Sequence, residues 1–116
     1  MSKQDIRHRD GNGLFHREGG LPAVILADGT QEWWVKGMLH REGDLPAVIY
    51  ANGDEEWWVD GVLHREGGLP AISRADGARQ WWLNGKLHRE GDLPAVIHAD
   101  DSQEWWVNGR RCKRGS

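Results

Sequence analysis

The sequence lacks the features that stabilise many small proteins or anchor them in membranes. Cys112 is the single cysteine, so no disulfide bond can form within the chain, and a reducing compartment is compatible. The longest apolar run, residues 21–27, is far too short to cross a bilayer, and the polar start has no signal-peptide core. No apolar pattern has helical spacing, and 16 glycines disfavour helices. We therefore expect a cytoplasmic, helix-free protein that is not bound to a membrane.

Phenylalanine and tyrosine are also nearly absent, with one of each, whereas tryptophan occurs eight times. The tryptophans form four pairs 24 residues apart, and each pair follows a Leu-Pro-Ala segment and an Asp-Gly, Asn-Gly or related turn. A fixed period of this length predicts a repeat array in which each unit buries apolar surface against its neighbours. The expected organisation is an N-terminal cap at residues 1–12, four units at 13–36, 37–60, 61–84 and 85–108, and a basic C-terminal cap at 109–116.

Each unit contains two segments that favour β-strands. The first is Leu-Pro-Ala followed by β-branched residues, and an Asp/Asn-Gly turn separates it from the second, which contains the tryptophan pair. A second glycine turn, such as Lys36-Gly37, ends the unit. This pattern predicts an all-β fold, a single-layer antiparallel β-meander of stacked β-hairpins.

The length of the turns decides which side chains share a face of this sheet. If both turns are three-residue loops, one face of the first unit carries Trp33 and Leu39, and the other carries Trp34, Met38 and His40. We then expect the first tryptophan of each pair to form the core. The second would lie on a more exposed face. That face would also carry two positions whose residue differs from unit to unit, which we call the variable columns; in the first unit they are Leu26 and Met38. Two-residue type I′ turns would change this assignment.

The two ends of the chain diverge from the repeated pattern and are expected to act as caps. Residues 109–113 continue the repeat register, with Arg111 in place of leucine and Cys112 in place of histidine. A charged last strand hinders edge-to-edge pairing with another chain. Residues 6–11 are interpreted as a degraded copy of the His-Arg-Glu-Gly motif.

The repeated unit resembles the MORN family, in particular short bacterial and viral variants with His-Arg-x-x-Gly-Pro-Ala units. In the fourth unit the matching segments are 85–95 and Trp106-Val107-Asn108-Gly109, and the resemblance covers residues 13–113. It implies elongated hairpin arrays that act as scaffolds, dimerise, bind proteins or, in some cases, bind phospholipid head groups. The chain departs from the family pattern in its 24-residue period, in its Trp-Trp pair in place of Tyr-x-Gly, and in the leucine before Pro-Ala.

The recurring His-Arg-Glu motif has the side chains of an acid–base site, but four equivalent copies argue for a structural role. We expect each histidine to donate to a backbone carbonyl of its own loop, and arginine and glutamate to pair between units. Equivalent histidines two strands apart are separated by roughly 9–10 Å, too far to share a zinc ion. No phosphate-binding loop or catalytic triad is present. We therefore expect no enzymatic activity, no metal and no cofactor.

The best hypothesis is a protein-binding module, expected to be a homodimer, that presents a tryptophan-lined sheet face. Residues 37–60 hold six carboxylates against one arginine, and only the tail is strongly basic, which argues against direct nucleic-acid binding. By analogy, such a protein could be a phage or bacterial inhibitor that neutralises a toxin or a nucleic-acid-processing defence complex. The expected binding residues are Trp34, Trp58, Trp82, Trp106, Tyr50, Arg74, Arg79, Asp54, Glu55, Glu56 and Asp60.

Three alternatives remain open at this stage. A sponge for nucleotides or small anions would use pockets between tryptophan and arginine. A structural or lipid-surface scaffold would follow from the family resemblance, although anionic head groups would repel the acidic body. A designed consensus array is the third, and the irregular third unit, with Ser73, Arg74 and Arg79, argues against it.

Overall fold

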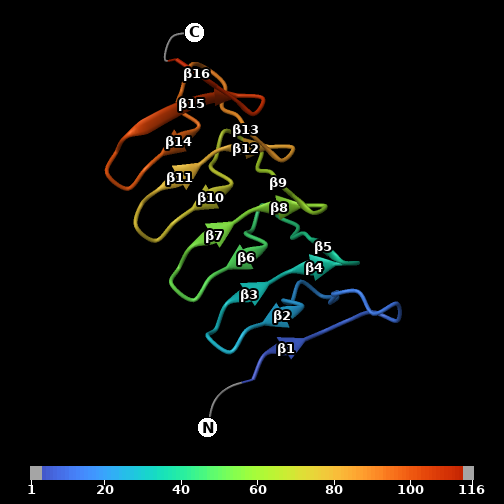
Figure 1. Ribbon diagram of the computed structural model, residues 1–116. Coiled ribbons are helices and arrows are strands. Elements are labelled where there is room, and N and C mark those ends of the chain that lie inside the picture. Colours follow the sequence, from blue (N-terminus) through green and yellow to red (C-terminus); the bar gives the residue numbers. More distant parts are fainter. Residues whose placement is uncertain (1–3, 114–116) are drawn as a thin grey trace.

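The computed structural model describes residues 4–113 and shows hairpins stacked in one direction from the N-terminal to the C-terminal end (Figure 1). The stack measures 50 × 31 × 20 Å along its principal axes. Its antiparallel strand order confirms the expected all-β meander of hairpins. Residues 4–113 contain no helix long and apolar enough to cross a membrane.

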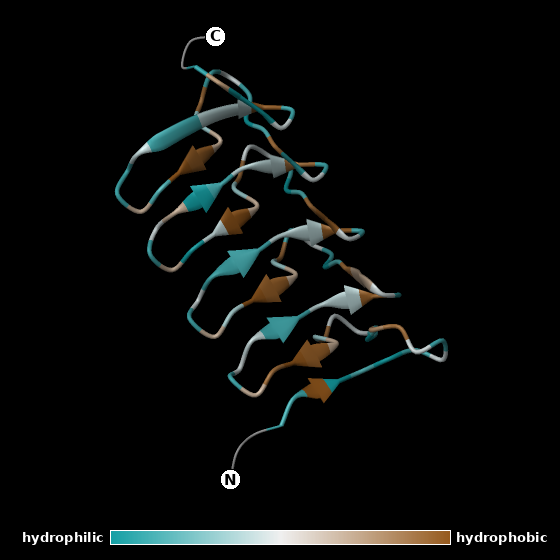
Figure 2. Cartoon of the chain, in the orientation of Figure 1, coloured by the Kyte–Doolittle hydropathy of each residue, from teal (hydrophilic) through white to brown (hydrophobic). Residues whose placement is uncertain are grey.

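Each unit contributes its first hairpin to one long antiparallel sheet of ten strands. In spatial order these strands are β1 (Ile6–Arg7), β2 (Val24–Ile25), β3 (Gln31–Glu32), β6 (Val48–Ile49), β7 (Glu55–Glu56), β10 (Ile72–Ser73), β11 (Arg79–Gln80), β14 (Val96–Ile97), β15 (Gln103–Val107) and β16 (Arg110–Cys112). Apolar strands alternate with strands of glutamate, glutamine and arginine along most of this sheet (Figure 2).

The second hairpins of the first three units form separate two-stranded sheets beside the long one (Figure 1). Trp33 marks the junction, because its N–H donates to Ala47 at 2.7 Å and its carbonyl accepts from His40 at 3.0 Å. The chain thus leaves one sheet for the other at the first tryptophan. The small sheets pair β4 (Trp34–Val35) with β5 (Met38–Leu39), β8 (Trp58–Val59) with β9 (Val62–Leu63), and β12 (Trp82–Leu83) with β13 (Lys86–Leu87).

The turn within each first hairpin is the expected three-residue loop. The Leu26 N–H donates to the Thr30 carbonyl at 2.8 Å, which leaves residues 27–29 as the loop, and the Gly29 N–H donates to the Leu26 carbonyl at 2.9 Å. Gly29 has φ +97°, in the left-handed region that glycine tolerates best. The first turn therefore keeps the predicted register of β2 and β3.

The turn within each second hairpin differs from the expectation, because it has two residues rather than three. Val35 pairs directly with Met38, and both turn residues have positive φ, 49° at Lys36 and 81° at Gly37. These angles define a type I′ turn. Met38 therefore shares a face with Val35, and Leu39 shares one with Trp34. The prediction that Met38 shares a face with Trp34, and Leu39 a face with Trp33, was therefore wrong. The two variable columns lie on opposite faces of the hairpins.

The core follows the first tryptophan of each pair, as predicted, in three of the four units. Trp33, Trp57 and Trp81 are 5–8% exposed, and the alanines beside them in the sheet are fully buried. Trp105, in the last unit, is only partly buried. Val24 and its equivalents are buried on the opposite face. Both faces of the sheet are therefore covered by side chains from the chain itself.

The recurring histidine near the start of each unit binds the turn that ends the same unit. The Asp60 N–H donates to Nδ1 of His40 at 3.1 Å, and the Gly61 N–H donates to the Leu39 carbonyl at 2.9 Å. The same contact with Nδ1 recurs at His16, His64 and His88. Since Nδ1 accepts, the ring proton lies on Nε2 and faces the nearby glutamate. The prediction that histidine donates to a backbone carbonyl was wrong.

The ends of the sheet are built differently from one another. At the C-terminus Trp106 pairs with Arg111 and Trp105 with Cys112, which confirms that these residues occupy the leucine and histidine positions. At the N-terminus the His8 N–H donates to the Ala23 carbonyl at 2.7 Å, just as the Trp33 N–H donates to the Ala47 carbonyl. Residues 6–9 therefore replace the strand that carries a tryptophan pair, and the interpretation as a His-Arg-Glu-Gly copy was wrong.

Candidate functional site

The loop that connects the second hairpin of one unit to the next sheet strand folds over the first tryptophan. In the loop of residues 40–47, the Asp44 carbonyl accepts from Nε1 of Trp57 at 3.2 Å. From the following unit, the Arg65 guanidinium lies 3.8 Å from the centre of the Trp57 ring. Nη1 of Arg65 also donates to the Pro70 carbonyl at 3.0 Å. Each buried tryptophan thus fixes the loops of two adjacent units, and stacking on an indole stabilises the guanidinium.

Successive loops leave a groove between them, which we call a loop groove. Three loop grooves, from the N-terminal end, have volumes of about 580, 450 and 500 Å³. In each, a tryptophan pair lies between the His-Arg-Glu motifs of two units. These volumes fall within the range of about 300–1,000 Å³ that is typical of ligand pockets. A smaller cavity of about 130 Å³ follows at the C-terminal end.

An exposed leucine stands in the loop of every unit, immediately before proline. These side chains, which we call the ridge leucines, are 42–49% exposed, and all four border loop grooves or the terminal cavity. They are Leu21, Leu45, Leu69 and Leu93. A regular row of exposed apolar side chains beside tryptophan is typical of an interaction surface. Sequence reasoning missed it, although a leucine repeated outside the strand was a signal.

The charged side chains of the loop grooves differ in exposure. The side chain of Arg65 is 14% exposed, and burial lowers the pKa of Arg41 and Arg89. The motif glutamates are 82–90% exposed, and each accepts from a histidine Nε2 of its own unit at 2.7–3.0 Å; they are Glu18, Glu42, Glu66 and Glu90. A ligand that approaches a loop groove therefore meets carboxylates first. The expected pairing of these glutamates with arginine was wrong.

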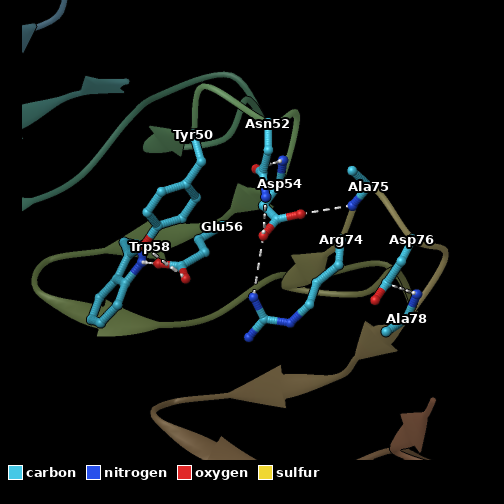
Figure 3. Close-up of polar contacts among 9 residues, drawn as sticks. All are labelled: Tyr50, Asn52, Asp54, Glu56, Trp58, Arg74, Ala75, Asp76 and Ala78. Carbon is cyan, nitrogen blue, oxygen red and sulfur yellow. Dashed lines mark hydrogen bonds and ion pairs between the residues drawn. The ribbon is translucent and has the colours of Figure 1, made fainter. Parts of the chain in front are cut away.

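The second tryptophans are partly buried and also line the loop grooves and the terminal cavity; they are Trp34, Trp58, Trp82 and Trp106. Each Nε1 donates at 2.8–2.9 Å to the glutamate or glutamine two residues earlier. In the second unit, Tyr50 donates to Glu56 at 3.1 Å, so Tyr50, Glu56 and Trp58 form one cluster (Figure 3). Three of the predicted binding residues are thus brought together in this unit, but their polar atoms are bonded to one another.

The remaining predicted residues do not form one site. Arg74 pairs with Asp54 at 3.5 Å, and Asp54 also accepts from the Ala75 N–H at 2.7 Å (Figure 3). Glu55 and Arg79 flank Ser73 in the sheet, on the face opposite Glu56. Asp60 lies in the turn between β8 and β9, at the other end of the unit. The predicted acidic patch is therefore divided between two faces and two ends of the hairpins.

We expect Tyr50 to ionise far above the ordinary range of tyrosine. Burial and the nearby Glu56 carboxylate raise the pKa of Tyr50 to about 12. Because folding favours the neutral phenol, this contribution to stability is fully present below pH ~10 and is lost as pH rises towards 12. Tyr50 is the only tyrosine, so tyrosinate absorbance near 295 nm reports this group alone. Glu56→Gln should lower the midpoint, and a wild-type midpoint near pH 10 would contradict the expectation.

No three histidine, cysteine or carboxylate side chains lie together as a metal site would require, within residues 4–113. Comparisons of the chain with models of known protein families, with curated proteins and with solved structures found no match.

Proposed function

We propose that the chain is a protein-binding module whose recognition surface is the row of loop grooves. One observation carries the proposal: three tryptophan-containing grooves follow one another, bordered by exposed ridge leucines. Aromatic side chains in grooves provide the large contact area on which protein interfaces depend. This surface includes three of the second tryptophans expected from the sequence, Trp34, Trp58 and Trp82, although their indole N–H groups are already bonded within the chain.

The charges favour a protein ligand over an anion or a membrane. A nucleotide or phosphate needs free cationic donors, whereas the guanidinium groups in the loop grooves bond proline carbonyls and three of them stack on indole rings. The exposed motif glutamates would repel both phosphate and anionic lipid. A row of similar grooves also suits one extended macromolecular ligand better than a single small molecule.

The charge of the loop grooves indicates the kind of partner. The exposed glutamates support a partner with a basic surface. Of the partners hypothesised from the sequence, a toxin or a nucleic-acid-processing complex, the second would have such a surface for its own substrate. Under this hypothesis the chain acts as an inhibitor that competes for that basic surface. A homodimer that joined two rows of loop grooves would instead bring like charges together, which is unfavourable.

Protein capture from a cell lysate tests the proposed surface. We expect the double variant Leu45→Glu/Leu69→Glu to retain roughly a tenth or less of the partner captured by the wild type, because charge in the contact opposes burial. Ile6→Glu is the matched control, because Ile6 is equally exposed at 49% but borders no loop groove. Equal capture by the wild type and the double variant would refute the proposed surface.

A further inference from the structure

We propose that the loop grooves bind a proline-rich segment in the polyproline II conformation with a basic side chain at every third residue. This inference rests on the proposed function and specifies its ligand. Its basis is the combination of three features of the row: the spacing of the grooves, their aromatic lining and their exposed carboxylates.

The spacing of the grooves matches the pitch of polyproline II. Equivalent positions in adjacent units are two strands apart in the long sheet, about 9.4–9.8 Å at the usual strand separation. A polyproline II helix advances about 9.3 Å in its three-residue turn, so every third side chain points the same way. Over three grooves the mismatch reaches only about 1 Å. A heptad of an α-helix advances about 10.5 Å and departs from the spacing sooner.

The lining of the grooves suits such a segment. Proline-rich ligands dock on aromatic grooves, and their conformation is already present before binding, which lowers the entropic cost. Each loop groove provides two tryptophans and a ridge leucine on either side. A polyproline II segment has no internal backbone hydrogen bonds and needs no free strand edge. The loop grooves lie between irregular loops rather than along an unpaired strand, so addition of a β-strand is not supported there.

Exposed negative charges recur with the same spacing as the loop grooves. One motif glutamate per unit borders a loop groove with its carboxylate 82–90% exposed. Asp60 adds a carboxylate, 72% exposed, to the first groove. The arginines of the same loops bond proline carbonyls within the chain. An arginine or lysine at every third ligand residue would therefore meet one exposed carboxylate in each unit.

Fluorescence anisotropy with labelled 12-residue peptides tests this inference on the full-length protein. We expect (Pro-Leu-Arg)₄ to bind roughly tenfold more tightly than three controls, because each control removes one of the three matched features. The controls are (Pro-Leu-Glu)₄, which reverses the charge, (Gly-Leu-Arg)₄, which removes the preformed conformation, and a scrambled peptide of the composition of (Pro-Leu-Arg)₄, in which arginine has no regular spacing. Equal binding of the three arginine peptides, or tighter binding of the acidic one, would overturn the inference.

A pair of matched variants locates the contact. Gln can still accept from His64, so Glu66→Gln removes the charge and keeps the fold. We expect this variant to bind (Pro-Leu-Arg)₄ about threefold more weakly or worse, and Glu55→Gln, on a sheet strand outside the loop grooves, to bind unchanged. Equal affinities of the two variants would also overturn the inference. If groove-dependent capture from lysate persists while no peptide binds, the ligand class is wrong and the proposed function stands.

Discussion

Replacing Trp57 by alanine is expected to lower the free energy of unfolding by about 3–5 kcal/mol, a large share of the ~5–15 kcal/mol typical of such a domain. Trp57 is 8% exposed, and its indole connects two units through the Asp44 carbonyl and the Arg65 guanidinium. Its removal leaves a cavity and takes away the surface on which Arg65 stacks. Urea unfolding followed by circular dichroism measures the loss without depending on tryptophan emission.

The chain contains its own control for this prediction. Trp105 occupies the equivalent position in the last unit and bonds its loop in the same way, through the Asp92 carbonyl at 3.2 Å. It is only partly buried, in contrast to Trp57. Trp105→Ala should therefore cost distinctly less stability than Trp57→Ala. Equal losses would show that burial between units does not determine how much the first tryptophans contribute to the free energy of unfolding.

The repeat period and local propensities were sufficient to predict the architecture. The 24-residue spacing, the β-branched segments and the glycine turns indicated stacked hairpins, and the first tryptophans form the core in three units as expected. Backbone preference fixed the first turn, because Gly29 supplies the left-handed residue of a three-residue loop. These features depend on neighbours close in the sequence.

The second turn shows where such reasoning failed. A glycine at its end fits a three-residue loop or a type I′ turn. Lys36 does not distinguish them, but Asp60, Asn84 and Asn108 at the same position, each before glycine, favour the type I′ turn. The turn is also held by residues far earlier in the chain, because the Phe15 carbonyl and the His16 ring accept from the amides of Gly37 and Lys36. One residue fewer in the turn reversed the faces of Met38 and Leu39.

The candidate site was harder to predict for the same physical reason. A loop groove exists only between two units, so no single unit contains its signal. The arginines were expected to pair with glutamate. Instead, Arg65 stacks on the indole of Trp57 and donates to the Pro70 carbonyl of its own loop. Once arginine is held there, the glutamates are left at the exposed rim, and this exposure supports a basic ligand.

Deleting one complete unit, residues 37–60, is expected to leave a folded protein, whereas deleting half a unit, residues 49–60, is expected to abolish folding. The complete deletion joins Lys36 to Gly61 and so restores a two-residue turn with glycine in the same place. His16 still accepts from the Lys36 amide, and Gly61 takes the position of Gly37. In a repeat array each unit contacts only its neighbours, so like positions can replace one another.

The shorter deletion joins Val48 to Gly61 and removes Trp57, half of β6 and all of β7 and β8, so β10 loses its neighbour in the long sheet. Circular dichroism and size-exclusion chromatography would separate the two outcomes, and similar behaviour of both deletions would contradict the stacking of independent units. The complete deletion also leaves two loop grooves instead of three. It should therefore weaken (Pro-Leu-Arg)₄ binding while leaving the remaining grooves intact, because affinity along the row depends on the number of matched units in register with the ligand.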